Sequence, residues 1–475
     1  MSSCLFAALL IATASASSPA IYAQTENSRS FPTGTLVPKV ATLKSAQQSY
    51  ALYLPSGYSP ARLWPVIYVF DPLARGELAL SQFEHAAELH GFIVAASNNS
   101  RNGPWSPQFE AAQAMVNDTQ QRFSIDIRRI YFAGFSGGAR VSSQLAILCK
   151  CAAGVLLSGA GFPHDSVPSS KAKFAVFSAV GDADFNYREV IPLQDQLDSA
   201  ALPHWLRVFD GAHQWPTPAV LDEALAWFRI QAMKPSLEPR DDIFIAAQLA
   251  ATKDRAAAFE RSTDLLSAWR EYGQAAASFD SLADVSALRS RAEALEKDKT
   301  VRESLKHERS ALEEQSRLSN DVLSAISTTP DSSSNFTPAD PAQSAQRLAR
   351  ELRERSVAEK KPDRAVILKR ALGGVFIGSI ELGNAALDNK NYPLAARYFA
   401  CAAEANPDSE GVLRQLAIAR ALSGDRKTAI EALLKAKQRT KDMNALTKWI
   451  QEEPSFARIR QDAALAFSRS KPQQP

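Results

Sequence analysis

Blocks of apolar and polar residues alternate along the first half of the chain. Six short segments are almost continuously apolar, which is typical of strands buried on both faces of a parallel sheet. The segments between them are longer and have helical periodicity, so we expect a doubly wound, mostly parallel α/β sheet. The expected strands are residues 65–70, 91–97, 129–135, 153–160, 173–180 and 204–209, and the expected helices are residues 79–90, 106–122, 138–149, 187–199 and 217–232.

Two further patterns bound this α/β region. Residues 49–58 (SYALYLPSGY) predict an antiparallel edge strand that ends in a Pro-x-Gly turn. Strand signals stop near residue 235, and residues 240–327 are rich in Ala, Leu, Glu, Lys and Arg with helical periodicity. Residues 328–343 (TTPDSSSNFTPADPAQ) have the composition of a linker. The chain is therefore expected to be multidomain.

The last part of the chain, 344–475, is helical and contains a repeat. Residues 382–409 and 416–437 align with an offset of 34 (416 − 382), which is the period of a tetratricopeptide repeat. The alternative is an ordinary helical bundle with a coincidental spacing. The matching positions are Leu382 and Leu416, Ala395 and Ala429, and Ala402 and Ala436, and the first copy adds Gly383, Tyr392, Phe399 and Pro407. This region resembles tetratricopeptide (TPR) proteins, and the resemblance implies a groove for a peptide or protein partner.

Composition narrows the function classes. The 475 residues include 54 Lys+Arg and 51 Asp+Glu, a net charge of +3 with no basic stripe, which argues against binding to nucleic acid or to a membrane surface. Three cysteines lie outside the N-terminal segment: Cys149, Cys151 and Cys401. We expect all three to be packing residues, since Cys149 and Cys151 are only two positions apart. No His or Cys spacing fits a metal, so neither a metal nor an organic cofactor is expected.

The N-terminus has the pattern of an export signal. Residues 5–16 are an apolar run followed by small residues, and cleavage after Ala23 would leave Gln24 as the new N-terminus. Cleavage after Ala16 is the alternative site. The segment MSSC departs from the signal pattern because it has no Lys or Arg, and the alternative interpretation is a frayed apolar tail. No segment approaches about 20 apolar residues, so no membrane span is expected. Residues 1–23 thus predict a periplasmic or secreted protein.

The candidate nucleophile is Ser136 in Gly-Phe-Ser-Gly-Gly, residues 134–138. An apolar strand (RIYFAGF) precedes the serine and a helical pattern (ARVSSQLAIL) follows it. A G-x-S-x-G turn between a strand and a helix lifts the serine above the sheet, and the helix N-terminus favours a developing oxyanion. The alternative is an ordinary tight turn, which also uses glycine.

A base and an acid should follow the serine in the order Ser, acid, His, on loops at the carboxyl ends of strands. Of the six histidines, only His213 comes after the candidate acids in the chain, directly follows an expected strand and precedes an expected helix. The other histidines are His85, His90, His164, His204 and His307. The loop after residues 173–180 offers Asp184 and, as a second choice, Asp182. Either Asp is otherwise explained as an Asx-turn or a helix N-cap.

The oxyanion hole and the substrate pocket are assigned by position in the chain. One N–H should come from Gly137, and the other from Leu73 in the loop after residues 65–70, because Pro72 has no N–H. Four polar or aromatic residues near the same end of the sheet are candidate substrate contacts, with loop polarity and packing as the alternative. They are Asn99, Arg101, Trp105 and Trp215.

Residues 45–230 resemble a secreted α/β-hydrolase of the esterase type, similar to feruloyl esterases, polyhydroxybutyrate depolymerases and dienelactone hydrolases. The matching motifs are GFSGG, the GDAD loop and the G-x-H-x-W-P ending. The resemblance implies a catalytic domain over 32–232 that hydrolyses a small-molecule or polymeric ester with Ser136, Asp184 and His213. Two alternatives stay open: an inactive hydrolase fold that acts as a scaffold through its repeats, and a serine peptidase with the same triad.

Overall fold

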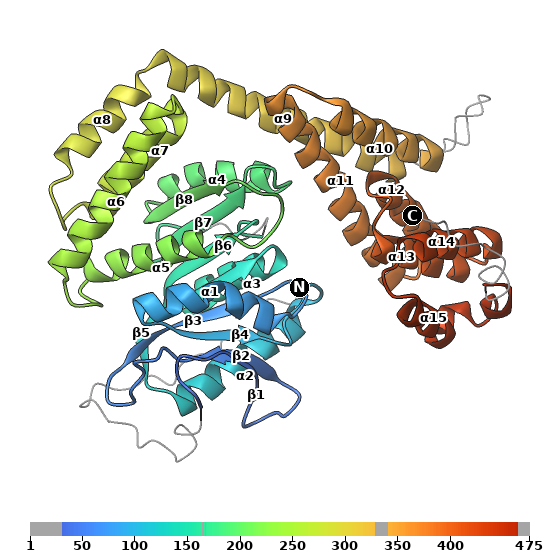
Figure 1. Ribbon diagram of the computed structural model, residues 1–475, viewed down its shortest axis with the longest axis horizontal. Coiled ribbons are helices and arrows are strands. Elements are labelled where there is room, and N and C mark those ends of the chain that lie inside the picture. Colours follow the sequence, from blue (N-terminus) through green and yellow to red (C-terminus); the bar gives the residue numbers. More distant parts are fainter. Residues whose placement is uncertain (1–30, 164–165, 167, 328–340, 464–475) are drawn as a thin grey trace. The chain divides into compact units, whose positions relative to one another are not determined.

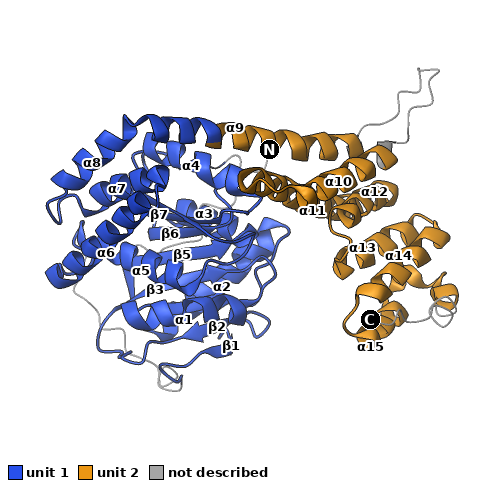
Figure 2. Cartoon of the chain, turned by 45° about the horizontal axis from the view of Figure 1, so that its top comes forward, with its two compact units in different colours: residues 1–307 blue, residues 308–475 orange. Residues whose placement is uncertain are grey.

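The computed structural model describes residues 31–163, 166, 168–327 and 341–463 (Figure 1). The chain divides into two compact units, Met1–His307 and Glu308–Pro475 (Figure 2). This division falls inside the predicted helical region, because most of that region packs on the α/β part. The predicted signal peptide, His164 and residues 328–340 of the predicted linker lie outside the described residues.

Unit 1 is built on a mixed eight-stranded sheet with the order β1-β2-β4-β3-β5-β6-β7-β8. Strands β3 to β8 run parallel to one another, while β2 is antiparallel to both β1 and β4. The strands are β1 Val37–Ala41, β2 Ser49–Tyr53, β3 Trp64–Phe70, β4 Ile93–Ser97, β5 Ile125–Phe135, β6 Ala152–Ser158, β7 Ala175–Gly181 and β8 His204–Phe209. The sheet has the doubly wound arrangement expected of an α/β-hydrolase, and all six predicted parallel strands are present.

The predicted edge strand is not at the edge. Strand β2 is fully buried, and β1 pairs with its outer side. The sequence of β1, VPKVA, is short and contains Pro and Lys, and only one of its five residues is buried. Proline and lysine are typical of edge strands, but they interrupt the apolar pattern by which a strand is recognised. The prediction of an antiparallel strand was correct, and its place in the sheet was wrong.

Helices cover both faces of the sheet. On one face, Leu80 of α1 (Gly76–His90) and Leu225 of α5 (Pro218–Met233) share a core with β3, β4 and β5. On the other face, α2 (Trp105–Arg122), α3 (Gly137–Cys149) and α4 (Tyr187–Ser199) contribute Met115, Val141 and Leu193 to a second core. Two apolar faces explain why the strands are apolar along their whole length.

The remaining helices of unit 1 follow α5 in the chain, and α6 to α8 contribute to an apolar cluster with it. They are α6 Asp242–Arg261, α7 Leu265–Phe279, α8 Ser286–Glu296 and the first part of α9 Lys299–Ser327. Ile230 and Met233 of α5 form an apolar cluster with Ile245 of α6 and Phe279 of α7. A buried ionic cluster lies beside it, in which Arg207 of β8 pairs with Glu223 of α5 and Glu271 of α7. Both kinds of contact attach these helices to the α/β core.

The described part of unit 2 consists of helices. They are the rest of α9, α10 Pro341–Ala358, α11 Pro362–Asp388, α12 Tyr392–Ala405, α13 Glu410–Leu422, α14 Arg426–Arg439, α15 Met443–Glu452 and the short 3-10 helix Pro454–Phe456. Helices α11 and α12 are in close contact because Gly383 leaves room for the ring of Phe399, which would lie 2.8 Å from a Cβ at residue 383. The repeat itself stays a prediction.

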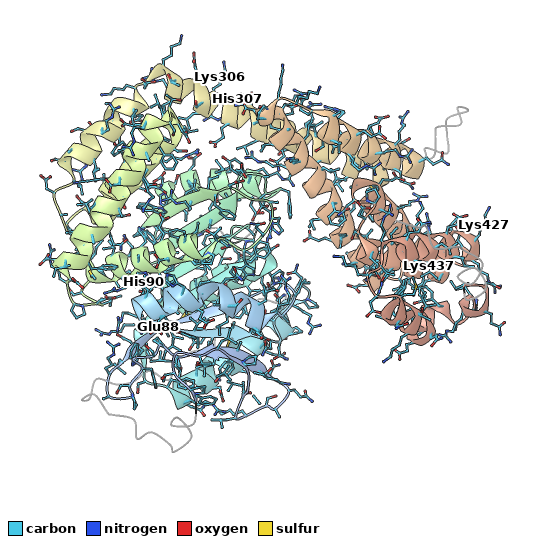
Figure 3. The ribbon with its side chains drawn as sticks, viewed as in Figure 1. Glu88, His90, Lys306, His307, Lys427 and Lys437 are labelled. Atoms are coloured by element: carbon cyan, nitrogen blue, oxygen red, sulfur yellow. A yellow bond between two sulfur atoms is a disulfide. The ribbon has the colours of Figure 1, made fainter. Side chains whose placement is uncertain are left out.

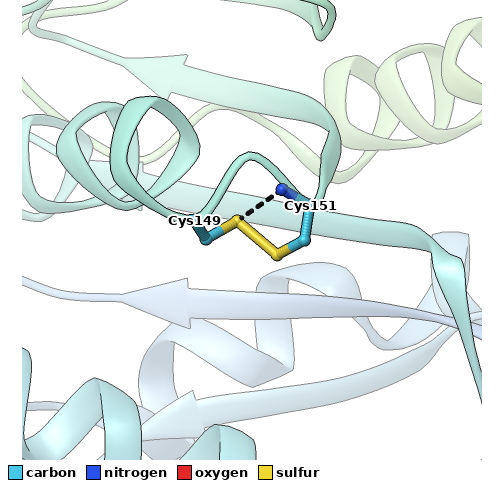
Figure 4. Close-up of a disulfide and its surroundings, with 2 residues drawn as sticks. All are labelled: Cys149 and Cys151. Atoms are coloured by element: carbon cyan, nitrogen blue, oxygen red, sulfur yellow. Dashed lines mark hydrogen bonds between the residues drawn. A yellow bond between two sulfur atoms is a disulfide. The ribbon is translucent and has the colours of Figure 1, made fainter. Parts of the chain in front are cut away.

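The expectation for two cysteines was wrong. Cys149 and Cys151 form a disulfide (Figure 4), while Cys401 is a buried free thiol as expected. Lys150, between the two, has φ of 53° in the left-handed region, and the Cα atoms of its neighbours lie 5.1 Å apart. That separation is within the usual disulfide range, so the turn removes the geometric objection to a bridge between such close residues.

Over the described residues, no helix combines the length and the apolar character that crossing a membrane requires.

Candidate active site

The serine turn joins β5 to α3. Ser136 has φ of 54° and ψ of −121°, and its N–H donates to the carbonyl of Ser158 at 2.8 Å. Two glycines make the close approach of strand and helix feasible, because a Cβ at Gly134 would lie 2.1 Å from Gly138 O and a Cβ at Gly138 would lie 2.0 Å from Phe70 O. A serine in such a strained backbone conformation is typical of a nucleophile elbow.

Three predicted residues meet at this turn. Nε2 of His213 lies 2.9 Å from Oγ of Ser136, and Nδ1 of His213 lies 2.9 Å from each carboxylate oxygen of Asp184. They come from three separate loops, after β5, β7 and β8. A carboxylate on Nδ1 leaves Nε2 as the atom that accepts the serine proton, which is the geometry of a Ser-His-Asp triad.

The acid of this arrangement is fully buried. The carboxylate of Asp184 has an exposed fraction of 0%, and its Oδ1 accepts the Asn186 N–H at 2.8 Å. Gly159 has φ of +61°, and a Cβ there would lie 2.9 Å from Asp184 Oδ2. Asp182, the second choice, instead accepts the Gly211 N–H at 3.0 Å and so fixes the loop that carries the histidine. The two aspartates therefore have different positions, and Asp184 is the one whose carboxylate lies within hydrogen-bond distance of His213.

Aromatic rings flank the histidine. The rings of Phe135 and Phe185 have centroids 4.6 Å and 4.3 Å from that of His213. The imidazole is partly buried, with 18% of its side chain exposed. These contacts restrict the ring to one orientation, which a general base needs.

Three other histidines lie away from this site. Figure 3 shows His90 near the end of α1 and His307 on α9. Nε2 of His90 lies 2.8 Å from Asp222 Oδ1, a contact that joins α1 to α5. His204 begins β8, at the opposite end of that strand from the loop of His213. Its ring Nδ1 lies 2.9 Å from the Leu202 carbonyl oxygen.

The two predicted oxyanion donors differ in their surroundings. Gly137 is the first residue of α3. The N–H groups in the first turn of a helix have no acceptor within the helix, so the helix does not use the Gly137 N–H. The Leu73 N–H, in contrast, donates to Asp71 Oδ1 at 2.9 Å. In this structure the Leu73 N–H therefore already donates its hydrogen bond to the Asp71 carboxylate and not to an oxyanion.

Asp71 organises the loop after β3. Its buried carboxylate also accepts hydrogen bonds from Arg75 at 2.8 and 2.9 Å and from Trp215 Nε1 at 3.0 Å. Burial alone would raise the pKa of Asp71, but the hydrogen bonds from Arg75, Trp215 and Leu73 outweigh it and hold the pKa below its ordinary value. Asp71 is therefore an ionised anchor.

The predicted substrate contacts fall into two groups. Asn99 accepts the Ser49 N–H at 2.8 Å and donates to the Gln47 carbonyl at 2.9 Å, and Trp215 is buried against Asp71, so both have structural partners. Arg101 and Trp105 are exposed, and the Trp105 ring stacks on Phe109 with centroids 5.6 Å apart. The role of these four residues in binding stays a prediction.

One residue beside the serine was not singled out from the sequence. A Cβ at Gly137 would lie 1.8 Å from Oδ1 of Asn102, so the Asn102 side chain lies directly against the nucleophile turn. The only sequence signal was Gly137, the second glycine of GFSGG, which the G-x-S-x-G pattern does not require.

Among the described residues, no group of three or more His, Cys, Asp or Glu side chains is arranged to hold a metal ion.

Comparison with solved structures finds proteins of low sequence and structural similarity to this chain. The chain is similar to fluorophosphonate-binding serine hydrolase F of Staphylococcus aureus, with 14% identity, 41% of this chain and 97% of that chain covered and a TM-score of 0.33. A ferulic acid esterase gives 16% identity, coverages of 41% and 97%, and a TM-score of 0.33. An esterase of the archaeon Pyrobaculum calidifontis gives 11% identity, coverages of 43% and 87%, and a TM-score of 0.33.

No protein-family model matches the sequence, and no curated protein matches it. At these identities and TM-scores, a functional conclusion has to rest on the geometry of this chain.

Proposed function

We propose that this protein is an exported serine hydrolase that cleaves carboxylic esters. The observation that supports the proposal most is the continuous hydrogen-bonded series Ser136–His213–Asp184, with distances of 2.9 Å at each step. The strained serine and the helix N-terminus behind it are consistent with an activated nucleophile.

The reaction proceeds by two acyl transfers. Ser136 Oγ attacks the ester carbonyl carbon while His213 Nε2 takes the hydroxyl proton, and the resulting oxyanion is stabilised by N–H donors. Collapse of the tetrahedral intermediate breaks the ester C–O bond, and the proton on Nε2 passes to the leaving alcohol. Water then attacks the acyl-enzyme and gives a proton to Nε2. Collapse of this second intermediate breaks the bond between Ser136 Oγ and the acyl carbon, Nε2 returns the proton to Oγ, and the carboxylic acid is released. Asp184 stabilises the imidazolium in both halves of the reaction.

The first experiment is fluorophosphonate labelling of the purified mature protein, read by intact mass. We expect one adduct on the wild type and on Ser106→Ala, an exposed serine of α2, and no adduct on Ser136→Ala. Hydrolysis of p-nitrophenyl esters without hydrolysis of peptide anilides would support an esterase over a peptidase. A folded wild type that takes no label would favour the scaffold alternative.

Export is part of the proposal and has a separate test. Residues 1–23 would be removed, so the intact mass of protein from the periplasm or medium should correspond to a chain that begins at Gln24. A mass that includes Met1 would contradict cleavage.

We also propose that α11 to α14 form two TPR-like hairpins that bind a protein or peptide partner or position the substrate. The helix caps support the repeat: Asn391 caps α12 by accepting the Leu394 N–H, and Asp425, 34 residues later, caps α14 by accepting the Thr428 N–H. If the hairpins are equivalent, Asn391→Ala and Asp425→Ala should each destabilise unit 2 by about 1 kcal/mol in urea unfolding. Very different losses would argue for an ordinary bundle.

A further inference from the structure

An ester hydrolase needs more than one donor for its oxyanion, and the loop after β3 does not supply the expected one. Pro72 has no N–H. The Leu73 N–H donates to the Asp71 carboxylate at 2.9 Å, and the Ala74 N–H donates to the Asp71 carbonyl at 3.1 Å. The donors of residues 72–74 are therefore absent or occupied within the loop itself.

The loop after β4 lies beside the loop after β3. The Asn102 N–H donates to the Pro72 carbonyl at 2.8 Å, and Leu73 and Arg101 form an antiparallel bridge. The two loops are thus joined by backbone hydrogen bonds. This connection fixes the backbone of Asn102 although its side chain is exposed.

The Asn102 side chain occupies the space above the residue that follows the nucleophile. A Cβ at Gly137 would lie 1.8 Å from Oδ1, 2.7 Å from Cγ and 3.1 Å from Nδ2 of Asn102. For Gly134 and Gly138 the obstructing atoms are backbone atoms of the turn and of β3. Glycine at residue 137 is therefore explained by the carboxamide of Asn102.

We propose that Asn102 donates the second hydrogen bond of the oxyanion hole through its side-chain N–H. This inference rests on the proposed function and deepens it. A half-turn of the amide about the Cβ–Cγ bond exchanges Nδ2 with Oδ1 and directs an N–H toward the oxyanion beside the Gly137 N–H. A side-chain amide in this role stabilises charge that develops in the transition state, so it acts on kcat more than on KM.

The test measures p-nitrophenyl butyrate hydrolysis by the full-length mature protein and its Asn102→Ala and Asn102→Asp variants. We expect kcat to fall about 100- to 1,000-fold in Asn102→Ala with KM changed less than about 3-fold. Asn102→Asp should lose more, because a carboxylate has no N–H and repels the oxyanion. Binding of an aliphatic trifluoromethyl ketone, a transition-state analogue, should weaken in parallel with kcat. Asn117→Ala, a matched change on α2, should leave kcat unchanged.

The outcomes separate this inference from the proposed function. If the wild type takes the fluorophosphonate label and hydrolyses the ester while Asn102→Ala keeps kcat within about 3-fold, the oxyanion role is overturned and the esterase stands. A rise in KM at unchanged kcat would also overturn it, since that result describes a substrate contact. A wild type with neither labelling nor hydrolysis overturns both proposals. Equal thermal unfolding midpoints of the variants exclude loss of the fold as the cause.

Discussion

The position of the Asn102 side chain limits the size of residue 137 to glycine. In Gly137→Ala the new methyl group would lie 1.8 Å from Asn102 Oδ1, so the exposed amide has to move. We expect kcat to fall about 10- to 100-fold with little loss of stability, because a flexible side chain can yield where backbone cannot. The measurement is steady-state ester hydrolysis together with thermal unfolding.

The control for this change is Gly273→Ala in α7, where a Cβ meets no atom within 4 Å. It should stabilise the helix by about 0.5–1 kcal/mol and leave kcat unchanged. The double variant Gly137→Ala/Asn102→Ala provides the decisive comparison. If the two residues act through one amide, it should be no slower than Asn102→Ala alone, and additive losses would contradict the pairing.

Asp71 predicts a pH dependence of stability. Hydrogen bonds hold its folded pKa below the ordinary value of 3.8 despite burial, so its stabilising contribution is present above that value and is lost as the pH falls through the folded pKa. Asp71→Asn should therefore lower the thermal midpoint at about pH 7, and the difference from the wild type should shrink at about pH 3. An equal difference at both pH values would mean that the charge of Asp71 contributes nothing.

At the scale of elements, buried charges fix the helices of unit 1 to the sheet. Glu271 of α7 is 1% exposed and pairs with Arg207 at 3.0 Å and with Arg255 at 2.9 Å. Burial raises the pKa of Glu271, although Arg207 and Arg255 act to lower it. Glu271→Ala would leave Arg207 buried with one partner fewer, and we expect a loss of about 3 kcal/mol in urea unfolding.

An exposed pair nearby is the matched comparison. Arg289 and Asp280 lie 3.0 Å apart with side chains 55% and 59% exposed, so Arg289→Ala should change stability by less than about 1 kcal/mol. Similar losses in the two variants would contradict the view that burial decides the strength of these contacts.

The elements differ in how well the sequence predicts them, for physical reasons. Parallel strands covered on both faces are apolar throughout, so β3 to β8 were predicted, while β1 was missed because an edge strand tolerates Pro38 and Lys39. The Cys149–Cys151 bridge was missed because a left-handed Lys150 leaves no mark in the sequence. In a parallel sheet, chain order fixes which loops meet, which is why Ser136, Asp184 and His213 could be brought together in advance.

The rest of the site depends on contacts between loops. Whether the Leu73 N–H is available depends on Asp71, and the position of Asn102 depends on its hydrogen bond to Pro72. Sequence periodicity describes helices and strands and carries no information on such pairings. The contacts among Ser136, His213 and Asp184 were therefore within reach of sequence reasoning, and the hydrogen bond between Leu73 and Asp71 was not.

At the scale of the whole molecule, every described hydrogen-bond partner of the triad belongs to unit 1. A fragment of residues 24–307 includes the part of α9 whose Val301 packs with Leu295 and Ala268. We expect it to fold and to keep kcat for p-nitrophenyl butyrate within about 3-fold of the full chain. A loss of more than about 10-fold in the folded fragment would give unit 2 a part in the reaction itself.

The contact between Asn102 and Gly137 also bears on how this chain could have diverged. Substitution of Gly137 is disfavoured while residue 102 is asparagine, because the Asn102 side chain occupies the space of a Cβ at residue 137. In a homologue without this asparagine, a larger residue at 137 would no longer meet that obstruction. The two positions should therefore covary among homologues, although 35 residues separate them (137 − 102). Homologues with Gly-x-Ser-Gly-Gly should carry asparagine in the loop after the fourth strand, and those with a larger residue after the serine should draw their oxyanion donor from elsewhere.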